Sequence, residues 1–401
     1  MICTTTFEGM ARRAAQALGM ATLPLVVVQH PLGGLQADEI MGRVREASER
    51  LGRLVGRAED TLEAINAYYR AHRWTDGLPI VPPTEERVEA MLRAVPVDPE
   101  RSLGRVPPLW CEATVEKVAI NAVMAGCEPT YLPVLIAAVD ALCDPAFNLY
   151  SIQATTHPVA PLLIVNGPIV QRIGLNSGSG VFGPGWQANA TIGRAVRLIL
   201  MNVGGAWPGE GDMATQGQPG KYSYCIAESE AASPWEPLHV ERGFAPDDSV
   251  VTVLGGEAPH NINDHVSRTA GGILGVIAQS MVTLGSNAKW ILRDSGYVVA
   301  LGPEHAATIA ADGFTKADAT RFLYETARLP LRELQRGGMW QMHDWPRWMQ
   351  AVGDPEARLP VVERPEAILA VVTGGPGKHS SVVPNFSIGQ TVSRRIVLPA
   401  E

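Results

Sequence analysis

The sequence has no apolar run that approaches the length of a membrane-spanning helix. Such a helix needs about 20 consecutive apolar residues. The first residues, Met1-Ile2-Cys3-Thr4-Thr5-Thr6, also lack the basic start and the apolar stretch of a signal peptide. We therefore expect a cytoplasmic protein that has no membrane partner.

Cysteine is scarce, and basic charge is not concentrated anywhere. The five cysteines are widely spaced and form no CxxC, which argues against a disulfide framework or a closed zinc site and indicates a reducing compartment. The net charge of −8 carries no basic stripe, so we expect no nucleic-acid partner. The 40 glycines and 31 prolines are scattered, which indicates tight turns rather than disorder.

Residues 1–56 have the pattern of a truncated Rossmann-like βαβ segment. Thr5 and Glu8, three residues apart, match a capping box at a helix start. Residues 23–28 are apolar and β-branched, which predicts a buried parallel strand. The expected elements are a strand end at 1–3, a helix at 9–18, a strand at 23–28 and a helix at 37–55.

A first strand of three residues is short for this kind of domain. A mononucleotide-binding half-domain has a further strand and helix before it. We therefore expect the missing half to lie upstream or on a partner chain. Because unpaired strand edges seek partners, a homo-oligomer or a partner chain would complete the N-terminal sheet.

Residues 57–401 have the alternating pattern of a larger mixed α/β domain, with a helical, Pro-rich lead-in at 57–110 and a domain boundary near Arg57. The expected helices are 60–72, 85–94, 114–125, 131–143, 190–202, 263–284 and 316–327. The expected strands are 162–165, 250–254, 297–301 and 368–373.

A sequence pattern recurs in this larger part, in which an apolar strand is followed by glycine. It occurs at residues 164–168, 253–256, 300–303 and 372–376, which suggests a degenerate repeat. Three of these strand ends reach a histidine within a few residues: His260, His305 and His379. Because ligands bind beyond the carboxyl ends of strands in open α/β sheets, the imidazoles could transfer protons or hold a metal there. Each could instead cap a turn or bond a carbonyl.

The most concentrated motif is Gly374-Gly375-Pro376-Gly377-Lys378-His379-Ser380. Glycines let backbone N–H groups approach an anion, and Lys378 adds charge, so a carboxylate, an oxyanion or a phosphate could bind. The spacing of a P-loop is absent, and a tight strand turn is the alternative. The predicted substrate-binding residues are Gly374, Gly375, Gly377, Lys378, Ser380, Asn189, Asn261 and Thr5.

Two further Gly-rich loops, residues 176–189 and 215–221, are long enough to suggest binding of a polar ligand. Asp76, in Trp74-Thr75-Asp76-Gly77-Leu78-Pro79, is a possible acid or base. An Asx-turn is the alternative use of this carboxylate.

Among the cysteines, Cys3 has the most reactive context. It lies at a strand end just before a helix start, where the helix dipole and the free N–H groups favour a thiolate. A small buried residue is the alternative. Cys111 and Cys127 flank a helix and could form a redox pair, whereas Cys143 fits a core position and Cys225 a strand interior.

Three segments resemble a known family: Ile2-Cys3-Thr4-Thr5-Thr6-Phe7, Leu23-Pro24-Leu25-Val26-Val27-Val28 and His30-Pro31-Leu32-Gly33. Together they are similar to the second half of the UGSC-type (seleno)protein domain. That family is named for a Sec/Cys-Gly-Ser-Cys motif after an earlier strand, and its members are regarded as thiol or selenol redox proteins. The motif does not occur in this sequence, so Cys3 alone carries the resemblance to redox chemistry. Residues 116–127 and the Gly-Lys-His-Ser loop resemble the long C-terminal region of some members.

The resemblance implies a thiol-dependent enzyme, an oxidoreductase in kind, that reduces a small polar or anionic molecule or cleaves a carbon–heteroatom bond in it. Cys3 would be the nucleophile or redox thiol, and His260, His305 and His379 would bind or protonate the substrate. One alternative is a metal-dependent lyase or hydrolase with these histidines as ligands. Another is a non-catalytic subunit that completes a partner chain. The sequence indicates neither a cofactor nor an electron donor.

Overall fold

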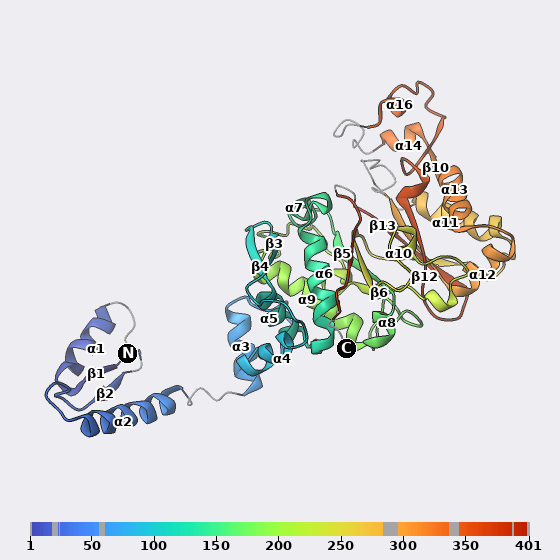
Figure 1. Cartoon of the computed structure of the whole chain (residues 1–401). Coiled ribbons are helices and arrows are strands. Elements are labelled where there is room, and N and C mark those ends of the chain that lie inside the picture. Colours follow the sequence, from blue (N-terminus) through green and yellow to red (C-terminus); the bar gives the residue numbers. More distant parts are fainter. Residues whose placement is uncertain are drawn as a thin grey trace. The chain divides into compact units, whose positions relative to one another are not determined.

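The computed structural model describes residues 2–17, 23, 25–55, 61–283, 296–336, 345–386 and 389–398. The chain divides into two compact units, Met1–Arg73 and Trp74–Glu401 (Figure 1). The boundary that the sequence suggests, near Arg57, falls in residues 56–60, which lie outside the described residues. The helix that follows this gap is grouped with the first unit.

The N-terminal unit is built on a βαβ arrangement. Strands β1 (Ile2–Thr4) and β2 (Val26–Val28) pair in parallel, with Cys3 opposite Val27. The helices of this unit are α1 (Glu8–Ala17), α2 (Ala37–Val55) and α3 (Leu62–Ala71). The predicted parallel strand pair with a helix between its members in the chain is therefore confirmed.

The predicted capping box at the start of α1 is wrong. Residues Thr5–Phe7 form a 3₁₀ turn, and α1 begins only at Glu8. The Thr5 hydroxyl accepts the backbone N–H of His30 at 3.2 Å, while Glu8 accepts from Arg12 on the next turn of its own helix. The Thr5 hydroxyl thus accepts a backbone N–H from the segment after β2, and not the N–H at the start of α1 that the capping box would use.

In its described residues, the C-terminal unit contains two four-stranded sheets and two short strand pairs. Its strands are β3 (Ser102–Val106), β4 (Cys111–Thr114), β5 (Ala160–Asn166), β6 (Cys225–Ala227), β7 (Val250–Gly256), β8 (His260–Asn263), β9 (Tyr297–Leu301), β10 (Arg328–Pro330), β11 (Arg358–Pro360), β12 (Ile368–Val372), β13 (His379–Pro384) and β14 (Val392–Arg395). Its helices are α4 (Glu85–Leu92), α5 (Val115–Ala125), α6 (Leu132–Cys143), α7 (Leu149–Gln153), α8 (Ile169–Arg172), α9 (Gln187–Asn202), α10 (Leu238–Glu241), α11 (Ala270–Thr283), α12 (Pro303–Ala311), α13 (Lys316–Thr326), α14 (Leu331–Gln335) and α16 (Arg347–Gln350). The prediction of a larger mixed α/β domain is confirmed.

The two four-stranded sheets have the same topology. One runs β6-β5-β7-β14 and the other β12-β9-β13-β8, and in each the first pair is parallel and the other two are antiparallel. The fourth strands are exchanged, since β8 follows β7 in the chain but pairs with β13, and β14 follows β13 but pairs with β7. In this arrangement β5 corresponds to β9, so the Gly-Pro ends of these two strands are equivalent positions of an internal repeat.

The sheets pack face to face and carry helices on their outer sides. Alternate residues of a strand point to opposite faces. In β9, Val298 and Ala300 therefore pack against the other sheet, while Val299 and Leu301 pack against α11, α12 and α13. Helices α6 and α9 contact the other sheet at β7, β14 and β6, so that four layers result (Figure 1). Each large apolar side chain buried in these layers stabilises the fold by about 1.5–3 kcal/mol.

The predicted helix 263–284 is wrong at its start. Asn263 is the last residue of strand β8 (His260–Asn263), and α11 begins only at Ala270. No single helix in the described part of the chain is long and apolar enough to cross a membrane. A bent pair, Pro129–Cys143 with Pro145–Gln153, meets the length and composition criteria only when its two members are taken together.

Candidate functional site

A cavity of about 340 Å³ lies where the carboxyl ends of β9 and β12 meet the start of β13. Six of the predicted site residues line it: Asn261, Gly374, Gly375, Gly377, His379 and Ser380. The segment Ser179–Phe182, from one of the two other Gly-rich loops, forms another part of the wall. The structure thus brings most of the predicted binding residues together in one place.

Close packing explains why the wall at Gly374 and Gly375 is made of glycine. Gly374 has a φ of 102°, in the region that favours glycine, and its N–H donates to Ser177 at 2.8 Å. A Cβ at Gly375 would lie 2.0 Å from the Ser179 hydroxyl. The loop therefore fits closely against the segment that faces it.

One backbone N–H of the predicted anion-binding loop is already bonded to a carboxylate of the chain itself. The N–H of Gly377 donates to the carboxylate of Glu304, from the first turn of α12, at 2.7 Å. Lys378 is not among the residues that line the cavity, and its carbonyl accepts the N–H of Asp264. The chain's own carboxylate thus occupies an amide that a bound anion was expected to use.

His379 is the residue in the cavity best placed to move a proton. Its Nδ1 lies 3.1 Å from Oδ1 of Asn261, and its Nε2 lies 3.3 Å from Nε2 of His265. Because an amide oxygen only accepts, Nδ1 carries the hydrogen in this bond, and in the neutral form of the ring Nε2 is the acceptor. Asn261 thereby fixes both the tautomer and the direction of the ring, as the orienting partner of a catalytic histidine does.

His265 was not predicted, and the sequence holds no signal for it. It comes after the end of β8 and meets His379 only because β8 pairs with β13 across more than a hundred residues.

His305 forms a separate, buried pair with Ser380. Its Nδ1 lies 2.8 Å from the Ser380 hydroxyl, and its Nε2 lies 3.1 Å from the carbonyl of Asp264. Since a carbonyl only accepts, Nε2 carries the hydrogen and Ser380 donates to Nδ1. The same hydroxyl accepts the N–H of Gly302 at 3.0 Å. The pair joins α12 to β13 and to the segment that follows β8.

The alternative in which His260, His305 and His379 together hold a metal is wrong. Successive residues of a strand point to opposite faces, so Ser380, and with it His305, lies on the helix-facing side of β13, whereas His379 lies on the side that faces the other sheet. His260 shares the helix-facing side of β8 with Ile262 and is exposed. Within the described residues, no three His, Cys, Asp or Glu side chains gather as a metal site.

Asn189 and Thr5, the remaining predicted binding residues, hold the backbone. Asn189 accepts the N–H of Asn176 at 2.8 Å and donates to the carbonyls of Asn176 and Cys225. It fixes the 176–189 loop to the start of α9. Thr5 holds the end of β2 in the N-terminal unit, as described above.

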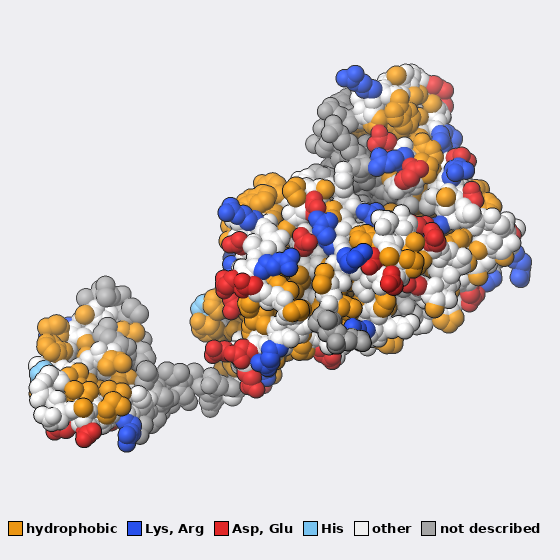
Figure 2. Space-filling model, viewed as in Figure 1, with side chains coloured by type: hydrophobic (Ala, Val, Ile, Leu, Met, Phe, Trp, Pro, Cys, Tyr) orange, Lys and Arg blue, Asp and Glu red, His pale blue; other side chains and the backbone are white. Residues whose placement is uncertain are grey.

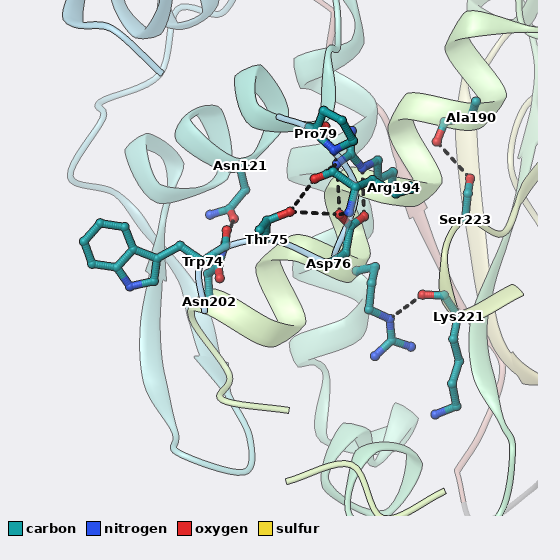
Figure 3. A network of polar contacts seen from close by, with 12 residues as sticks. Trp74, Thr75, Asp76, Pro79, Asn121, Ala190, Arg194, Asn202, Lys221 and Ser223 are labelled. Carbon is teal, nitrogen blue, oxygen red and sulfur yellow. Dashed lines mark hydrogen bonds and ion pairs between the residues drawn. The ribbon is translucent and has the colours of Figure 1, made fainter. Parts of the chain in front are cut away.

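The Asx-turn alternative for Asp76 is confirmed, because its Oδ1 accepts the N–H of Leu78 at 3.2 Å. The carboxylate has a second role that the sequence did not indicate. It receives two hydrogen bonds from Arg194 of α9, at 2.8 and 2.9 Å, and its side chain is 3% exposed (Figure 3). Arg194 also donates to the carbonyl of Pro79 at 2.8 Å. Asp76 thus fastens the lead-in segment to α9.

The predicted redox pair of Cys111 and Cys127 is wrong. Cys111 is the first residue of β4, four residues before α5, and Cys127 lies two residues after this helix, whose eleven residues span about 16 Å at 1.5 Å per residue. The Cα atoms of a disulfide lie about 4.4–6.8 Å apart. All five cysteines are free thiols.

Comparison with known proteins places the first part of the chain. Residues 1–57 match the model of the UGSC family. No curated protein and no solved structure matches the chain. The match covers the βαβ segment that contains Cys3 and the His30-Pro31 turn. The N-terminal 57 residues are thus similar to the UGSC family, and the two-sheet unit lies outside this match.

Proposed function

We propose that the chain is a cytoplasmic enzyme that acts on a small polar or anionic molecule held in the strand-end cavity. His379 moves a proton to or from this molecule in the cavity of the C-terminal unit. Cys3, in the N-terminal unit, is the reactive thiol of a separate step of the same reaction, a reduction or the cleavage of a carbon–heteroatom bond. The observation that carries the proposal is the His379 imidazole at a cavity wall, fixed through Nδ1 by Asn261 and with Nε2 at 3.3 Å from Nε2 of His265, a second group that can take part in the proton transfer.

The cavity suits a small polar guest. Its volume of about 340 Å³ lies at the small end of the usual range for ligand pockets, about 300–1,000 Å³. Serine residues 179 and 381 and the glycine backbone of the loop supply polar groups, while Val181, Phe182 and Ala300 supply apolar wall. A general acid–base group beside such a wall contributes about 10²–10⁴-fold to a rate.

The choice of Cys3 as the thiol rests on the environments of the other cysteines. Burial raises the pKa of Cys127 to about 12 and that of Cys143 to about 11, and it also raises the pKa of Cys225. Thiols held in this protonated state are poor nucleophiles. Cys3 and the exposed Cys111 remain, and Cys3 is the one in the segment that matches the UGSC family.

A substrate screen followed by two replacements tests the proposal. The purified chain is incubated with small disulfides, sulfoxides and α-substituted carboxylates, and turnover is followed by NMR. For a compound that is turned over, we expect His379→Gln to lower kcat about a hundredfold because proton transfer is lost. Cys3→Ser should abolish turnover.

His260→Gln is the matched control, since His260 is also an exposed strand-end histidine but lies on the other face of its strand. It should leave kcat unchanged. Full activity of His379→Gln would remove the cavity from the proposal, and full activity of Cys3→Ser would remove the thiol.

A specific observation favours a second candidate, in which a second copy of the chain completes the N-terminal sheet. Apolar side chains are exposed on this unit: Ile2 (59%), Phe7 (48%), Met10 (61%), Met41 (58%) and Val44 (50%). Figure 2 shows hydrophobic side chains gathered on one face of the unit. Exposed apolar patches of this kind often mark contact surfaces.

Under this candidate, the full chain is a dimer in solution, and charge on the apolar face separates it. Met10→Glu combined with Met41→Glu should convert the dimer to a monomer in multi-angle light scattering, because burying two carboxylates in an apolar interface is costly. Glu86→Gln, on α4 of the other unit, is the control and should leave the dimer intact. A wild-type monomer at 100 μM, a concentration on the order of that at which weak dimers form, would count against this candidate.

A further inference from the structure

The C-terminal unit holds a second cavity, of about 670 Å³, which has no part in the proposed reaction. It lies between α9 and the segment 206–222, which includes the Gly-rich loop at 215–221. Its lining residues are Asp76, Arg197, Met201, Ala206, Pro208, Asp212, Ala214, Gln216, Gly217, Gln218, Pro219, Lys221 and Tyr222. Four of them carry a formal charge.

Arg197 is a buried charged residue of this cavity, and its terminal nitrogens lie beyond hydrogen-bond distance of the nearest carboxylate. The residue is 7% exposed. Its Nε donates to the carbonyl of Lys221 at 2.8 Å, but the carboxylate of Asp212 lies 3.6 Å from its terminal nitrogen, beyond hydrogen-bond distance. A guanidinium has five N–H donors in a rigid fork. Among the described residues, therefore, the terminal donors of Arg197 have no hydrogen-bond acceptor, and Arg197 lines the cavity.

Asp212 is already occupied by other donors. Its Oδ2 accepts from Lys221 at 2.6 Å, and its Oδ1 accepts the N–H of Ala214 at 3.0 Å. Burial and the neighbouring Arg197 lower the pKa of Lys221, which fits two cations that share one carboxylate. The same Asp212 thus cannot neutralise both side chains.

The charged side chains in and beside this cavity carry one more positive than negative charge. Asp76 is paired with Arg194 through two hydrogen bonds, so that pair is neutral by itself. Arg197 and Lys221 share the carboxylate of Asp212, and Asp76, the other carboxylate near Arg197, is already paired with Arg194. A buried, unbalanced cation is costly unless a counter-charge joins it. One singly charged anion would restore neutrality, whereas a doubly charged phosphate would exceed it.

The rest of the wall is apolar and suits a short hydrocarbon tail. Met201 and Ala206 are buried, with exposed fractions of 5% and 0%, and Pro208 and Pro219 continue this surface. Tyr222, which is 56% exposed, also lines the cavity. A ligand with a charged head and an apolar tail would match the cation and the wall together.

We propose that this cavity binds a small monocarboxylate, with its carboxylate held by the terminal nitrogens of Arg197 beside Lys221 and its tail against the Met201 side of the cavity. The geometry of the guanidinium fork favours a planar carboxylate, which can accept two parallel hydrogen bonds. The proposal is independent of the reaction proposed for the strand-end cavity and stands whether or not that reaction is found.

Calorimetric titration of the full chain with butyrate, butyramide and inorganic phosphate tests the ligand class. Butyramide has the same shape as butyrate but no charge. We expect butyrate to bind about 10- to 100-fold more tightly than butyramide, the ratio that a hydrogen-bonded charge contributes. Phosphate should bind more weakly than butyrate. Equal binding of butyrate and butyramide, or tighter binding of phosphate, would overturn the proposal.

Two replacements locate the site. Arg197→Met keeps the length of the side chain and should weaken butyrate binding about 10- to 100-fold, while Arg197→Lys keeps the charge without the fork and should weaken it less. Arg321→Met, on the exposed surface of α13, is the control and should bind butyrate as wild type does. Unchanged affinity in folded Arg197→Met contradicts the site. If that variant does not fold, the titrations of the wild-type chain decide.

Discussion

Replacing Lys316 with methionine is expected to lower the free energy of unfolding by about 3–5 kcal/mol. Lys316 is the first residue of α13 and is 5% exposed. Its ammonium donates to the carbonyl of Glu236 at 2.6 Å and to the carboxylate of Glu241 at 3.0 Å, and it lies 3.8 Å from Glu228. Glu228 is 2% exposed, so the replacement leaves a buried carboxylate without its counter-ion.

The penalty should depend on pH in a definite direction. Burial raises the pKa of Glu228, and Lys316 opposes this in part. A carboxyl whose pKa is higher in the folded state binds its proton more tightly there, so stability falls as the pH rises from the unfolded value, about 4.3, through the folded one. Loss of Lys316 raises the folded pKa further. The Lys316→Met penalty should therefore be larger at pH 8 than at pH 5.

Urea unfolding followed by tryptophan fluorescence at both pH values measures this penalty. Lys117→Met is the control, because Lys117 also lies in the first turn of a helix but is exposed, and it should change stability by about 0.5 kcal/mol or less. Lys316→Met with Glu228→Gln should recover part of the loss, since no uncompensated charge remains. A penalty as small as that of the control would show that the buried pair does not stabilise the fold.

The sequence predicted the elements in which every residue favours the same secondary structure. Strand β9 was predicted with its observed bounds because its five residues are apolar or aromatic throughout, and α2 because its amphipathic pattern runs for 19 residues. Strand β8 was missed, since His-Asn-Ile-Asn has one apolar residue and only its partner β13 makes it a strand. Helix α12 was missed because Pro303 was taken as part of a strand turn, although proline suits a first helical turn.

The exchange of the fourth strands could not be predicted, because it depends on pairing between residues far apart in the chain. Val392 of β14 pairs with Val253, 139 positions earlier. The candidate site depends on the same kind of pairing, since Asn261 and His379 meet across β8 and β13. The separation of His305 from His379 also depends on the structure, because His379 and Ser380, the partner of His305, are adjacent in β13 and face opposite ways.

The Gly-rich loops show what loop composition alone can predict about the positions of cavities. Residues 374–377 and 176–189 were both predicted as binding loops, and residues 374–377 and 179–182 line one cavity. The loop at 215–221 lines the other cavity, but its charged partner Arg197 sits within α9, in a helix that gave no sign of a site. Loop composition thus indicated where cavities form, whereas the charges inside them came from distant elements.

Replacing Asp76 with asparagine is expected to lower the free energy of unfolding by about 3 kcal/mol. Asparagine can still accept the N–H of Leu78, so the turn survives, but the Arg194 guanidinium, whose side chain is 15% exposed, loses its counter-ion. Urea unfolding measures the loss. Thr75→Val removes the hydrogen bonds from the Thr75 hydroxyl to the carbonyl of Leu78 and to Oδ1 of Asp76 but leaves the Asp76–Arg194 charge pair in place, so it is the control and should cost about 1 kcal/mol.

A double replacement separates the charge from the packing in this pair. Asp76→Asn with Arg194→Met removes both charges and should be more stable than Asp76→Asn alone, because an unpaired buried cation costs more than an apolar side chain of similar length. If the double variant is instead the less stable of the two, the bond from Arg194 to the carbonyl of Pro79 outweighs the ion pair. The lead-in segment would then be held to α9 by that backbone contact, and Asp76 would serve the turn alone.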